Sequence, residues 1–301
     1  MIVIPLGTAS AMPTKKRHLP ALAVTAGAAT VLFDCGEGTQ LRMMQAGVNH
    51  TRVKAIFITH LHGDHYFGLL GLLSTMMLAS RQCPLTIVAP NQLEDFLDGL
   101  PTVFDMTFTI RHVGLPENFS SGLVFETDGF TVEACALDHR VFAVGYRLEE
   151  KRRPGNLDVE AARALGVTEF VHFRALKRGH RVVLHSGNMV TPDAVLTKSP
   201  LPRSMAYVTD TRPCAGSKHL ARQASLVYHE ATFGDAFEER AQETGHSTAR
   251  QAAAVARSSG AKRLLLGHFS ARYADAQPLV NEAREVFPQT EAAVELQRYE
   301  I

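Results

Sequence analysis

Short apolar runs alternate with longer amphipathic or alanine-rich segments along most of the chain. Runs rich in β-branched and aromatic residues, bounded by glycine-containing turns, predict strands, and the longer segments predict helices. The predicted strands are residues 2–6, 30–34, 53–58, 85–88, 108–113, 124–127, 131–137, 205–209, 226–228 and 263–267. The predicted helices are residues 41–46, 66–79, 92–97, 158–165 and 248–259. This order of elements predicts an α/β protein in which helices pack on sheets.

Two of the predicted helices carry explicit end signals. Thr248 and Gln251 have the spacing of a capping box, in which the two side chains satisfy each other's backbone amides at the start of a helix. The helix over 158–165 is followed by Gly166, which can adopt the left-handed conformation that ends many helices. We expect both helices to have these bounds.

Four ionisable residues occur within six positions at a predicted strand-to-helix junction. They are His60, His62, Asp64 and His65. A polar turn with incidental histidines would explain each residue alone, but a compact loop between buried elements disfavours so many ionisable groups unless something compensates them. Imidazole and carboxylate groups are ligands for zinc and other first-row divalent ions. The spacing therefore favours a metal site over an incidental turn.

The same placement recurs elsewhere in the chain. His60, His139, Asp210, Glu230 and His268 each lie at, or just beyond, the end of a predicted strand. A lone histidine after a strand is usually structural. In layered α/β folds, however, functional groups gather where strands end and loops begin, so five repetitions indicate one shared site.

Composition limits where this protein works and what it binds. The 301 residues carry a net charge of only +1, so a nucleic-acid partner requires a local basic patch. The four cysteines are widely separated and form no C-x-x-C pair, which favours reduced thiols. No apolar run reaches roughly 18 residues and no signal peptide is visible. These features predict a soluble, cytoplasmic protein with no membrane association.

One segment departs from the neutral balance. Between residues 151 and 181 there are eight lysines and arginines against three acidic residues. The cations are Lys151, Arg152, Arg153, Arg163, Arg174, Lys177, Arg178 and Arg181. The segment has few apolar positions for a core of its own. We therefore expect residues 150–200 to form a basic arm inserted into a single domain over residues 1–301.

The pattern His60-x-His62-x-Asp64-His65 resembles the signature of the metallo-β-lactamase superfamily, whose members hydrolyse esters, amides and phosphodiesters. The resemblance implies an α/β fold, an αβ/βα four-layer sandwich with the arm inserted. A longer series of motifs, in order along nearly the whole chain, is similar to the ribonuclease Z (tRNase Z) family. They are Asp34-Cys35-Gly36-Glu37-Gly38-Thr39-Gln40, His139-Arg140-Val141-Phe142, Asp210-Thr211, His229-Glu230-Ala231-Thr232, His246-Ser247-Thr248 and His268-x-Ser270-x-Arg272-Tyr273.

Spacing and resemblance together imply two divalent ions per subunit. The first would be held by His60, His62 and His139, and the second by Asp64, His65 and His268, with Asp210 bridging them. Zinc is the expected metal, and manganese or cobalt would suit the same ligands. Such a pair of ions hydrolyses phosphodiesters.

Three side chains are expected to move or hold protons in this reaction. Asp64 would orient the attacking water or accept its proton. His246 would protonate the leaving oxygen, and Glu230 would hold the imidazole and raise its pKa. From position alone, His246 is equally well explained as a residue that precedes a helix cap; the resemblance favours the catalytic role.

The resemblance also implies a substrate and a partner. It predicts an endoribonuclease that acts as a homodimer and cuts precursor tRNA after the discriminator base, leaving a 3′-hydroxyl. The expected RNA contacts are Lys15, Arg17 and Arg272 near the cut, and Lys151, Arg152, Arg153, Lys177 and Arg178 in the arm, a tRNA-binding exosite. Recognition of the tRNA by its shape fits this division.

Three positions depart from the family pattern. His18 stands where the family usually has asparagine, Glu169-Phe170-Val171 replaces a Gly-Pro pair of the arm, and Val208-Thr209 precedes Asp210 in place of Ser-Gly or Phe-Gly. Two other functions stay open. One is a phosphodiesterase of the same fold acting on another RNA or a small phosphodiester. The other is a non-catalytic RNA-binding protein, which the complete set of ligands disfavours.

Overall fold

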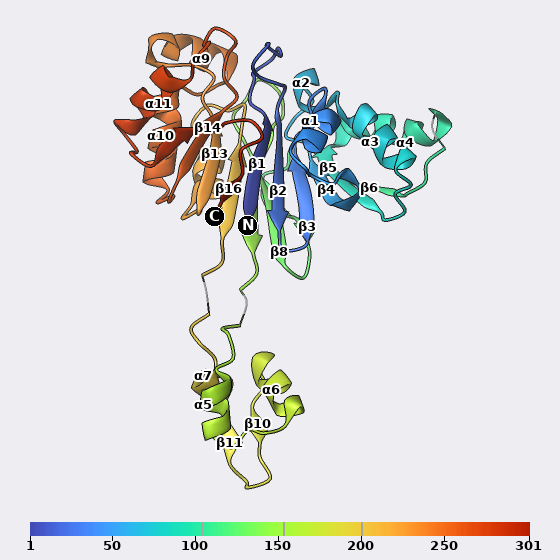
Figure 1. Ribbon diagram of the computed structural model, residues 1–301. Helices are drawn as coiled ribbons and strands as arrows, with labels where there is room; N and C mark the ends of the chain where they lie inside the picture. Colours follow the sequence, from blue (N-terminus) through green and yellow to red (C-terminus); the bar gives the residue numbers. More distant parts are fainter. Residues whose placement is uncertain (104, 153, 200) are drawn as a thin grey trace. The chain divides into compact units, whose positions relative to one another are not determined.

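The computed structural model describes residues 1–103, 105–152, 154–199 and 201–301, and these form two compact units (Figure 1). Unit 1 contains Met1–Glu149 and Arg203–Ile301, and unit 2 is Glu150–Pro202. Unit 2 is therefore an insertion within unit 1, and each unit has a hydrophobic core of its own.

The first sheet of unit 1 has the strand order β16-β1-β2-β3-β4-β5-β6. Strands β1, β2 and β3 pair antiparallel, whereas β3 to β6 are parallel. The strands are β1 (Ile2–Gly7), β2 (Ala21–Ala26), β3 (Ala29–Phe33), β4 (Val53–Phe57), β5 (Leu85–Pro90), β6 (Ile110–Leu115) and β16 (Tyr299–Glu300). The parallel half orients β3, β4 and β5 alike, so their carboxyl ends lie on one edge of the sheet.

The second sheet has the order β15-β14-β13-β12-β9-β8-β7. Strands β12 to β15 are parallel, and β9 pairs antiparallel with β12. The strands are β7 (Ser121–Glu126), β8 (Phe130–Ala136), β9 (Val144–Glu150), β12 (Ser204–Val208), β13 (Leu226–Glu230), β14 (Leu264–Gly267) and β15 (Thr290–Ala292). Because β12, β13 and β14 run in parallel, the residues that follow them emerge at the same edge.

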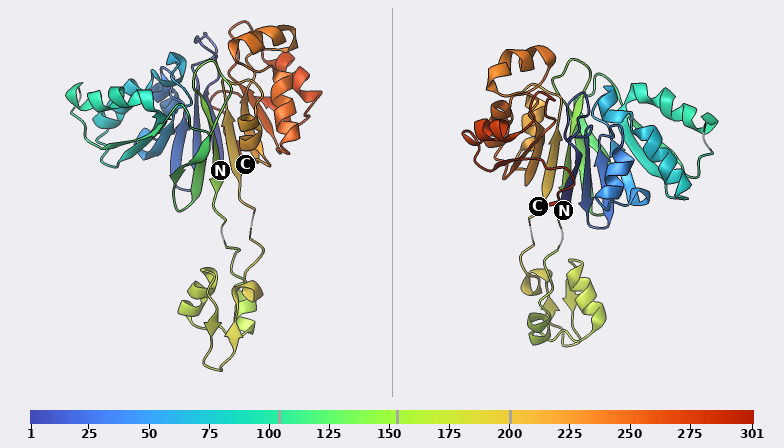
Figure 2. Two further views of the ribbon diagram at one scale, coloured as in Figure 1. Left: turned by 180° about the vertical axis from the view of Figure 1, so that it is seen from behind. Right: turned by 45° about the horizontal axis from the view of Figure 1, so that its top comes forward.

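Helices cover the outer faces of both sheets (Figures 1 and 2). The first sheet carries α1 (Thr39–Gln45), α2 (Gly63–Tyr66), α3 (Leu69–Leu78) and α4 (Glu94–Val103), with the 3-10 turns η1 (His50–Arg52) and η2 (Asn91–Leu93). The second carries α8 (Ala215–Ala221), η3 (Asp235–Phe237), α9 (Glu238–Thr244), α10 (Ala249–Ser258) and α11 (Gln277–Arg284). The layer order of unit 1 is helix, sheet, sheet, helix.

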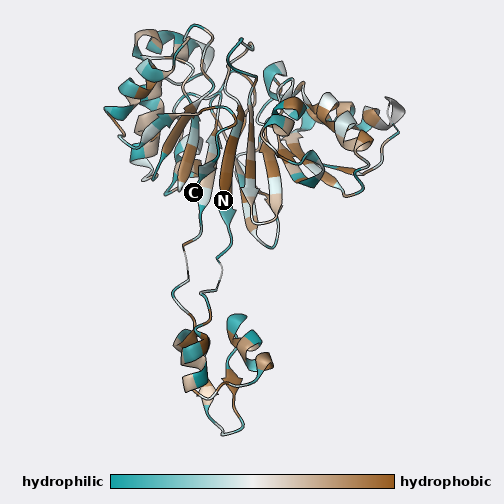
Figure 3. Ribbon diagram, in the orientation of Figure 1, coloured by the Kyte–Doolittle hydropathy of each residue, from teal (hydrophilic) through white to brown (hydrophobic). Residues whose placement is uncertain are grey.

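Three apolar clusters hold these layers together. The middle one lies between the sheets and includes Phe33, Phe57, Tyr146 and Tyr207, all almost fully buried. One outer cluster joins the first sheet to α1, α3 and α4, and the other joins the second sheet to α8, α10 and α11. The strands are correspondingly among the most apolar parts of the chain (Figure 3). The expected αβ/βα four-layer sandwich is confirmed.

Most predicted elements of unit 1 are present, but one predicted helix is divided and several observed elements were not predicted, among them β2, β9, α8, α9 and α11. The helix predicted over 66–79 is divided into α2 and α3 around Phe67 and Gly68. A β-carbon on Gly68 would lie 2.0 Å from the carbonyl oxygen of Gly36. Glycine at the break therefore lets this turn contact the loop that follows β3. The alanine-rich β2 and the strand β9 had no clear signal in the sequence. Alanine has low strand propensity, and pairing with β1 and β3 decides the conformation of β2.

The two predictions of helix ends are confirmed. The capping box of Thr248 and Gln251 opens α10, and Asp158 caps α5 (Val159–Ala164), which ends before Gly166 at φ 89°. All four cysteines are free thiols. None of the helices in the described parts of the chain has the length and apolarity needed to span a lipid bilayer.

Unit 2 is a small mixed module. It contains α5, α6 (Phe170–Lys177), the two-stranded sheet of β10 (Val182–Val183) and β11 (Met189–Val190), and α7 (Pro192–Val195). Buried side chains on these elements form its core, among them Ala162, Leu176, Val182 and Val195. The unusual Glu169-Phe170-Val171 begins α6, where Phe170 and Val171 are 80% and 60% exposed.

Candidate metal centre

The strand-end residues of unit 1 converge at one edge of the two sheets. His60 follows β4, His139 follows β8, and Asp210 and His268 follow β12 and β14. Together with Asp64 they belong to groups of side chains whose ligand atoms lie within 4.8 Å of one another. The sheet topology therefore brings segments from both halves of the chain into one cluster.

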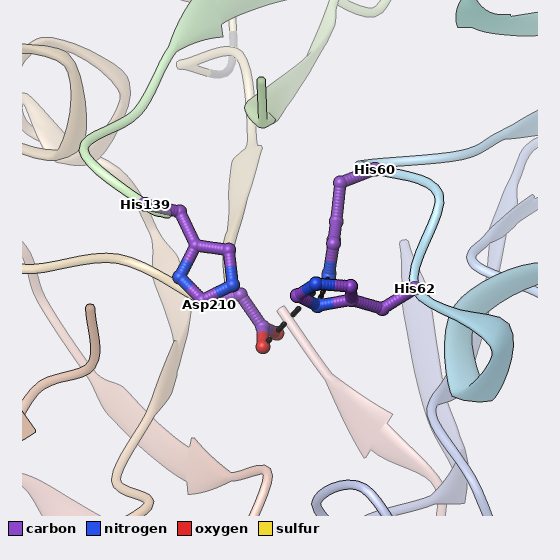
Figure 4. Close-up of side chains that lie close together, drawn as sticks. All are labelled: His60, His62, His139 and Asp210. Carbon is purple, nitrogen blue, oxygen red and sulfur yellow. Dashed lines mark hydrogen bonds and ion pairs between the residues drawn. The ribbon is translucent and has the colours of Figure 1, made fainter. Parts of the chain in front are cut away.

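Two of these groups match the ligand sets expected from the sequence. The first is His60, His62, His139 and Asp210, whose side chains point toward a common centre from separate segments (Figure 4). The second is Asp64, His65 and His268. A third possible group, Asp210, His246 and His268, overlaps the second. Asp210 thus belongs to the first and third groups and lies between the two expected sets.

Short distances around Asp210 define the centre of the cluster. Its Oδ2 atom lies 3.3 Å from Nε2 of both His65 and His268, and its Oδ1 atom lies 3.9 Å from Nε2 of His60. Asp210 is buried, which opposes ionisation, but the surrounding histidines hold the pKa of its carboxyl well below the ordinary value. The cluster therefore contains a buried carboxylate among imidazoles.

The unpartnered nitrogens of the cluster test whether a metal ion fits there. Nε2 of His65, His139 and His268 is buried and has no hydrogen-bond partner among the described residues. In each case Nδ1 is engaged, by Asp34, by the Gly245 carbonyl and by the Thr232 hydroxyl respectively. Histidines that bind metals typically have one nitrogen held by the protein and the other directed at the ion. The residues fit a divalent metal.

Asp34 is a functional residue that the sequence analysis did not select. Its buried carboxylate accepts hydrogen bonds from Tyr207 Oη at 3.0 Å and from the Thr59 amide at 2.8 Å, and lies 2.7 Å from His65 Nδ1. The Thr59 hydroxyl connects it further to His60 Nδ1, 3.0 Å away. Asp34 therefore orients two candidate ligands. The available signal was an aspartate at a strand end before Gly36, the same placement as the other site residues.

The charge of Asp34 also favours a cation in the centre. Burial opposes protonation of His65, but the carboxylates of Asp210 and Asp34 outweigh this effect and hold its pKa well above the ordinary value. A bound metal ion would satisfy the same demand for positive charge at His65.

We expect Asp34→Asn to lower divalent-metal affinity by about 10–100-fold, the effect typical of losing a carboxylate behind a ligating histidine. Asparagine keeps the side-chain volume, so the fold should be retained. Competition with a chromophoric chelator measures the affinity. Asp128→Asn, at an exposed turn outside the cluster, is the matched control. Equal metal affinity in the two variants would contradict the role given to Asp34.

Three residues of the centre have strained backbones. Asp34, Asp210 and His268 have φ values of 57°, 50° and 55°, in the left-handed region that residues other than glycine rarely adopt. Asp34 and His268 directly follow the last residues of β3 and β14, and Asp210 comes two residues after the end of β12. Such strain costs free energy and is found mainly where surrounding structure enforces a functional geometry.

Gly245 positions His139 in a way that no sequence pattern indicated. Its carbonyl oxygen lies 2.7 Å from His139 Nδ1, although 106 residues separate them in the chain. The glycine has a φ of 79°, and a β-carbon there would lie 2.8 Å from the imidazole. Only glycine combines this conformation with this close approach.

The half-buried His246 pairs with the buried Glu230. The carboxylate Oε1 lies 3.0 Å from His246 Nδ1, and it also accepts a hydrogen bond from the Thr211 amide. Thr232 donates its hydroxyl to Oε2 at 2.5 Å. Burial lowers the pKa of His246, but the Glu230 carboxylate outweighs it and raises the pKa to about 9. The pairing with Glu230 thus favours the protonated form of His246, whose Nδ1 lies 3.8 Å from Asp210 Oδ1.

The three cations expected near the cut have different surroundings. Lys15 is exposed. Arg17 donates to the Tyr273 carbonyl at 2.6 Å and lies over the Phe269 ring, so it also anchors its loop. Arg272 lies over the rings of Phe233 and Phe237, and Phe233 in turn contacts His246. Arg272 is therefore linked to the metal centre through one aromatic ring.

The expected arm contacts belong to unit 2. Arg152 and Arg178 are exposed, and Lys177 donates its ammonium group to the Gly155 carbonyl at 2.8 Å. Lys151 is half-buried. Arg153 lies outside the described residues. Lys177 thus also holds the segment around Gly155, where the chain enters unit 2.

Comparison with known proteins identifies the relatives of this chain. It is 54% identical to "Ribonuclease Z" of Salinibacter ruber over 99% of this chain and 94% of that protein. It is 42% identical to "Ribonuclease Z" of Myxococcus xanthus over 94% of this chain and 91% of that protein. The crystal structure of the short form of human tRNase Z superposes with a TM-score of 0.69 at 29% identity, covering 100% of this chain and 99% of that one.

One family model matches a part of the chain. It is described as "Anti-Pycsar protein Apyc1" and matches residues 1–136. This range contains the motif at His60–His65 but ends before His139, Asp210, His246 and His268. The full-length relatives, in contrast, cover every segment of the metal centre.

The fold, the His/Asp cluster and the relatives agree. The cluster has the composition of a divalent-metal site, and it occupies a four-layer sandwich shared with a solved tRNase Z structure. Identity above one half over nearly the whole chain is far beyond what a shared fold alone would require. The chain belongs to the ribonuclease Z family, the metal-dependent tRNA 3′-processing endoribonucleases of the metallo-β-lactamase superfamily.

Proposed function

We propose that this chain removes the 3′ trailer of precursor tRNA by hydrolysing the phosphodiester after the discriminator nucleotide, which leaves a 3′-hydroxyl on the tRNA. The observation that carries the proposal is the combination of a His/Asp metal cluster with an adjoining His246–Glu230 pair. A metal cluster alone suits many hydrolytic reactions, whereas a half-buried imidazole paired with a carboxylate beside it suits a poor alkoxide leaving group, which needs a proton.

The ligands proposed for two ions follow the geometric groups. His60, His62 and His139 would hold one ion, and Asp64, His65 and His268 the other, with Asp210 between them. Zinc is the metal that we propose, and manganese or cobalt would suit the same donors. When bound, two such ions supply an acidified water and neutralise charge on the attacking and leaving oxygens.

The side chains of the site would do the rest of the work. The Asp64 carboxylate accepts a hydrogen bond from the Ala11 amide at 3.0 Å, and this bond fixes the orientation of the carboxylate. The carboxylate would orient the attacking water or accept its proton. The new bond joins the water oxygen to phosphorus, and the bond from phosphorus to the 3′-oxygen breaks.

His246 would protonate the departing 3′-oxygen. Its Nδ1 is held by Glu230, so the proton on Nε2 is the one left to donate. The negative charge of Glu230 favours the protonated ring before the reaction. Three donors, the Thr211 amide and the amide and hydroxyl of Thr232, hold the Glu230 carboxylate in place, and the carboxylate in turn orients the ring. The pair therefore works as an acid and its support.

Unit 2 is proposed as the tRNA-binding arm. Its exposed cations include Arg174, Arg178 and Arg181, on and after α6. Phosphate contacts from such side chains bind a folded RNA without reading its sequence. The charge excess of residues 151–181 in a chain of net charge +1 supports this role.

Reversing the charge of Arg174, Arg178 and Arg181 to glutamate should weaken tRNA binding by about 10–100-fold and lower the salt dependence of binding by about one unit of slope per lost phosphate contact. Hydrolysis of a small chromogenic phosphodiester should be unchanged, because the metal centre belongs to unit 1. The control variant changes Lys54, Arg257 and Lys262, which are exposed in unit 1, to glutamate, so that the same number of charges is reversed. An equal loss in both triple variants would show that total charge, and not unit 2, binds the RNA.

A homodimer and a cytoplasmic location complete the proposal. Leu41 and Met44 on α1, Phe67 at the end of α2 and Leu70 on α3 are between 41% and 63% exposed. Large apolar side chains exposed together on neighbouring helices are what a self-association face requires. Light scattering on the purified protein measures the subunit number.

The decisive experiment uses metal-loaded protein and a 5′-labelled precursor tRNA with a 3′ trailer. We expect one metal-dependent cut after the discriminator nucleotide, absent in Asp64→Ala. Hydrolysis of a simple phosphodiester with the precursor left intact would overturn the substrate and keep the chemistry. That result would favour the second candidate, a phosphodiesterase for another RNA or a small phosphodiester.

A further inference from the structure

A small pocket opens beside His62, a candidate metal ligand. Its volume is about 220 Å³, and it is formed by four loops of unit 1, after β4, β5, β6 and β8. The lining residues are Leu61, His62, Pro90, Gln92, Glu117, Val141 and Phe142. None of these except His62 has a role in the proposed reaction. The pocket therefore requires a separate explanation.

The walls of the pocket are apolar. Pro90 is buried, Leu61 and Phe142 are half-buried, and Val141 is 42% exposed. Flat apolar surfaces with an aromatic side chain suit a stacked ring. The volume is below the roughly 300–1,000 Å³ of pockets that hold drug-sized ligands, so it admits one ring system and not a whole nucleotide.

The rim of the pocket is rich in hydrogen-bond acceptors. The Gln92 side-chain amide donates to Glu117 Oε1 at 2.7 Å, and both residues are exposed. The second carboxylate oxygen and the Gln92 carbonyl stay available as acceptors. A carboxylate repels phosphate groups, so the partner of Glu117 in an RNA is a ribose hydroxyl or the edge of a base, and of these only the base carries a flat ring that suits the apolar walls. Exocyclic amino groups of bases are suitable donors.

The position of the pocket selects one side of the scissile phosphate. The ring of His139 is a common neighbour of the pocket and the proposed acid, 5.2 Å from the ring of His62, which lines the pocket, and 5.1 Å from the ring of His246, the proposed acid. The departing 3′-oxygen belongs to the discriminator nucleotide and must lie near His246. The nucleotide that keeps the phosphate then lies toward His62.

We propose that this pocket binds the base of the first trailer nucleotide and favours a base with an exocyclic amino group, through stacking on Phe142 and a hydrogen bond to Glu117. The inference rests on the proposed function and deepens it. It makes Glu117 a specificity-determining residue for the RNA on the trailer side.

Two synthetic precursor tRNAs test the proposal, differing only at the first trailer nucleotide, adenosine in one and purine riboside in the other. Purine riboside lacks the amino group and keeps the ring. We expect kcat/KM to be about tenfold higher for adenosine, the effect of one hydrogen bond to a charged group. Glu117→Ala should reduce this ratio to about one, and Asp128→Ala, a carboxylate lost elsewhere, should leave it unchanged.

The outcomes separate this inference from the proposed function. Equal cleavage of both precursors by the unaltered enzyme would overturn the base pocket while leaving the tRNA-processing activity in place. A preference that persists in Glu117→Ala, or that follows the discriminator nucleotide when the same replacement is made there, would also overturn it. Failure to cleave either precursor would overturn the proposed function itself.

Discussion

Asp210→Ala is expected to lower precursor-tRNA cleavage by at least about 10³-fold and to reduce bound metal at both halves of the centre, because metal ions supply several kcal/mol of transition-state stabilisation. Asp210 is the carboxylate closest to the middle of the cluster, within 3.3 Å of His65 and His268 and 3.9 Å of His60. No other acidic side chain in the described part of the chain has this combination of contacts.

Elemental analysis of the purified variant measures the metal, and circular dichroism checks the fold. Asp210→Asn preserves the side-chain volume, so it distinguishes the loss of charge from the loss of packing. Asp128→Ala is the matched change at an exposed turn. Full metal content in both Asp210 variants would show that the carboxylate is not a shared ligand.

His246→Ala is expected to slow precursor-tRNA cleavage by about 10²–10⁴-fold, the range for losing a general acid, while metal content stays intact. The reason is geometric: Glu230 holds His246 at 3.0 Å and keeps it protonated beside the cluster. Hydrolysis of bis(p-nitrophenyl) phosphate should fall much less, because a nitrophenolate leaves without needing a proton. The contrast between the two substrates is the signature of the acid.

The same variant also tests a competing role. His246 forms a possible metal-binding group with Asp210 and His268, so a ligand role would make the variant lose metal. Loss of metal, or an equal loss of activity on both substrates, would contradict the proposed acid. His219→Ala is the matched control, since His219 lies 2.8 Å from Glu133 in a second His–Glu pair outside the cluster.

The residues of the His/Asp cluster were predictable because their signals are local or repeat along the chain. His60, His62, Asp64 and His65 share one loop, and the loop alone indicated metal binding. His139, Asp210 and His268 were predictable from a repeated placement at strand ends, which parallel strands convert into proximity. The strands themselves were predictable where β-branched and aromatic residues dominate, as in β4, but not in the alanine-rich β2.

The supporting residues could not be predicted, because their roles depend on partners far away in the chain. Asp34 acts on Thr59 and His65, which are 25 and 31 residues away, and Gly245 acts on His139 across 106 residues. The pocket lined by Leu61, Glu117 and Phe142 lies between loops that come together only when the two sheets pack against each other.

The sequence by itself therefore determined the fold class, the family and the donor atoms that can bind metal. The fold class and the donor atoms follow from the periodicity of apolar residues and from local spacing, which a linear chain already contains, and the family follows from the resemblance of its motifs. The tertiary structure alone decided how each donor is oriented, which nitrogen of His246 faces Glu230, and where the pocket beside His62 lies. Those properties depend on distances of a few ångströms between segments, and such distances exist only after the two sheets have packed.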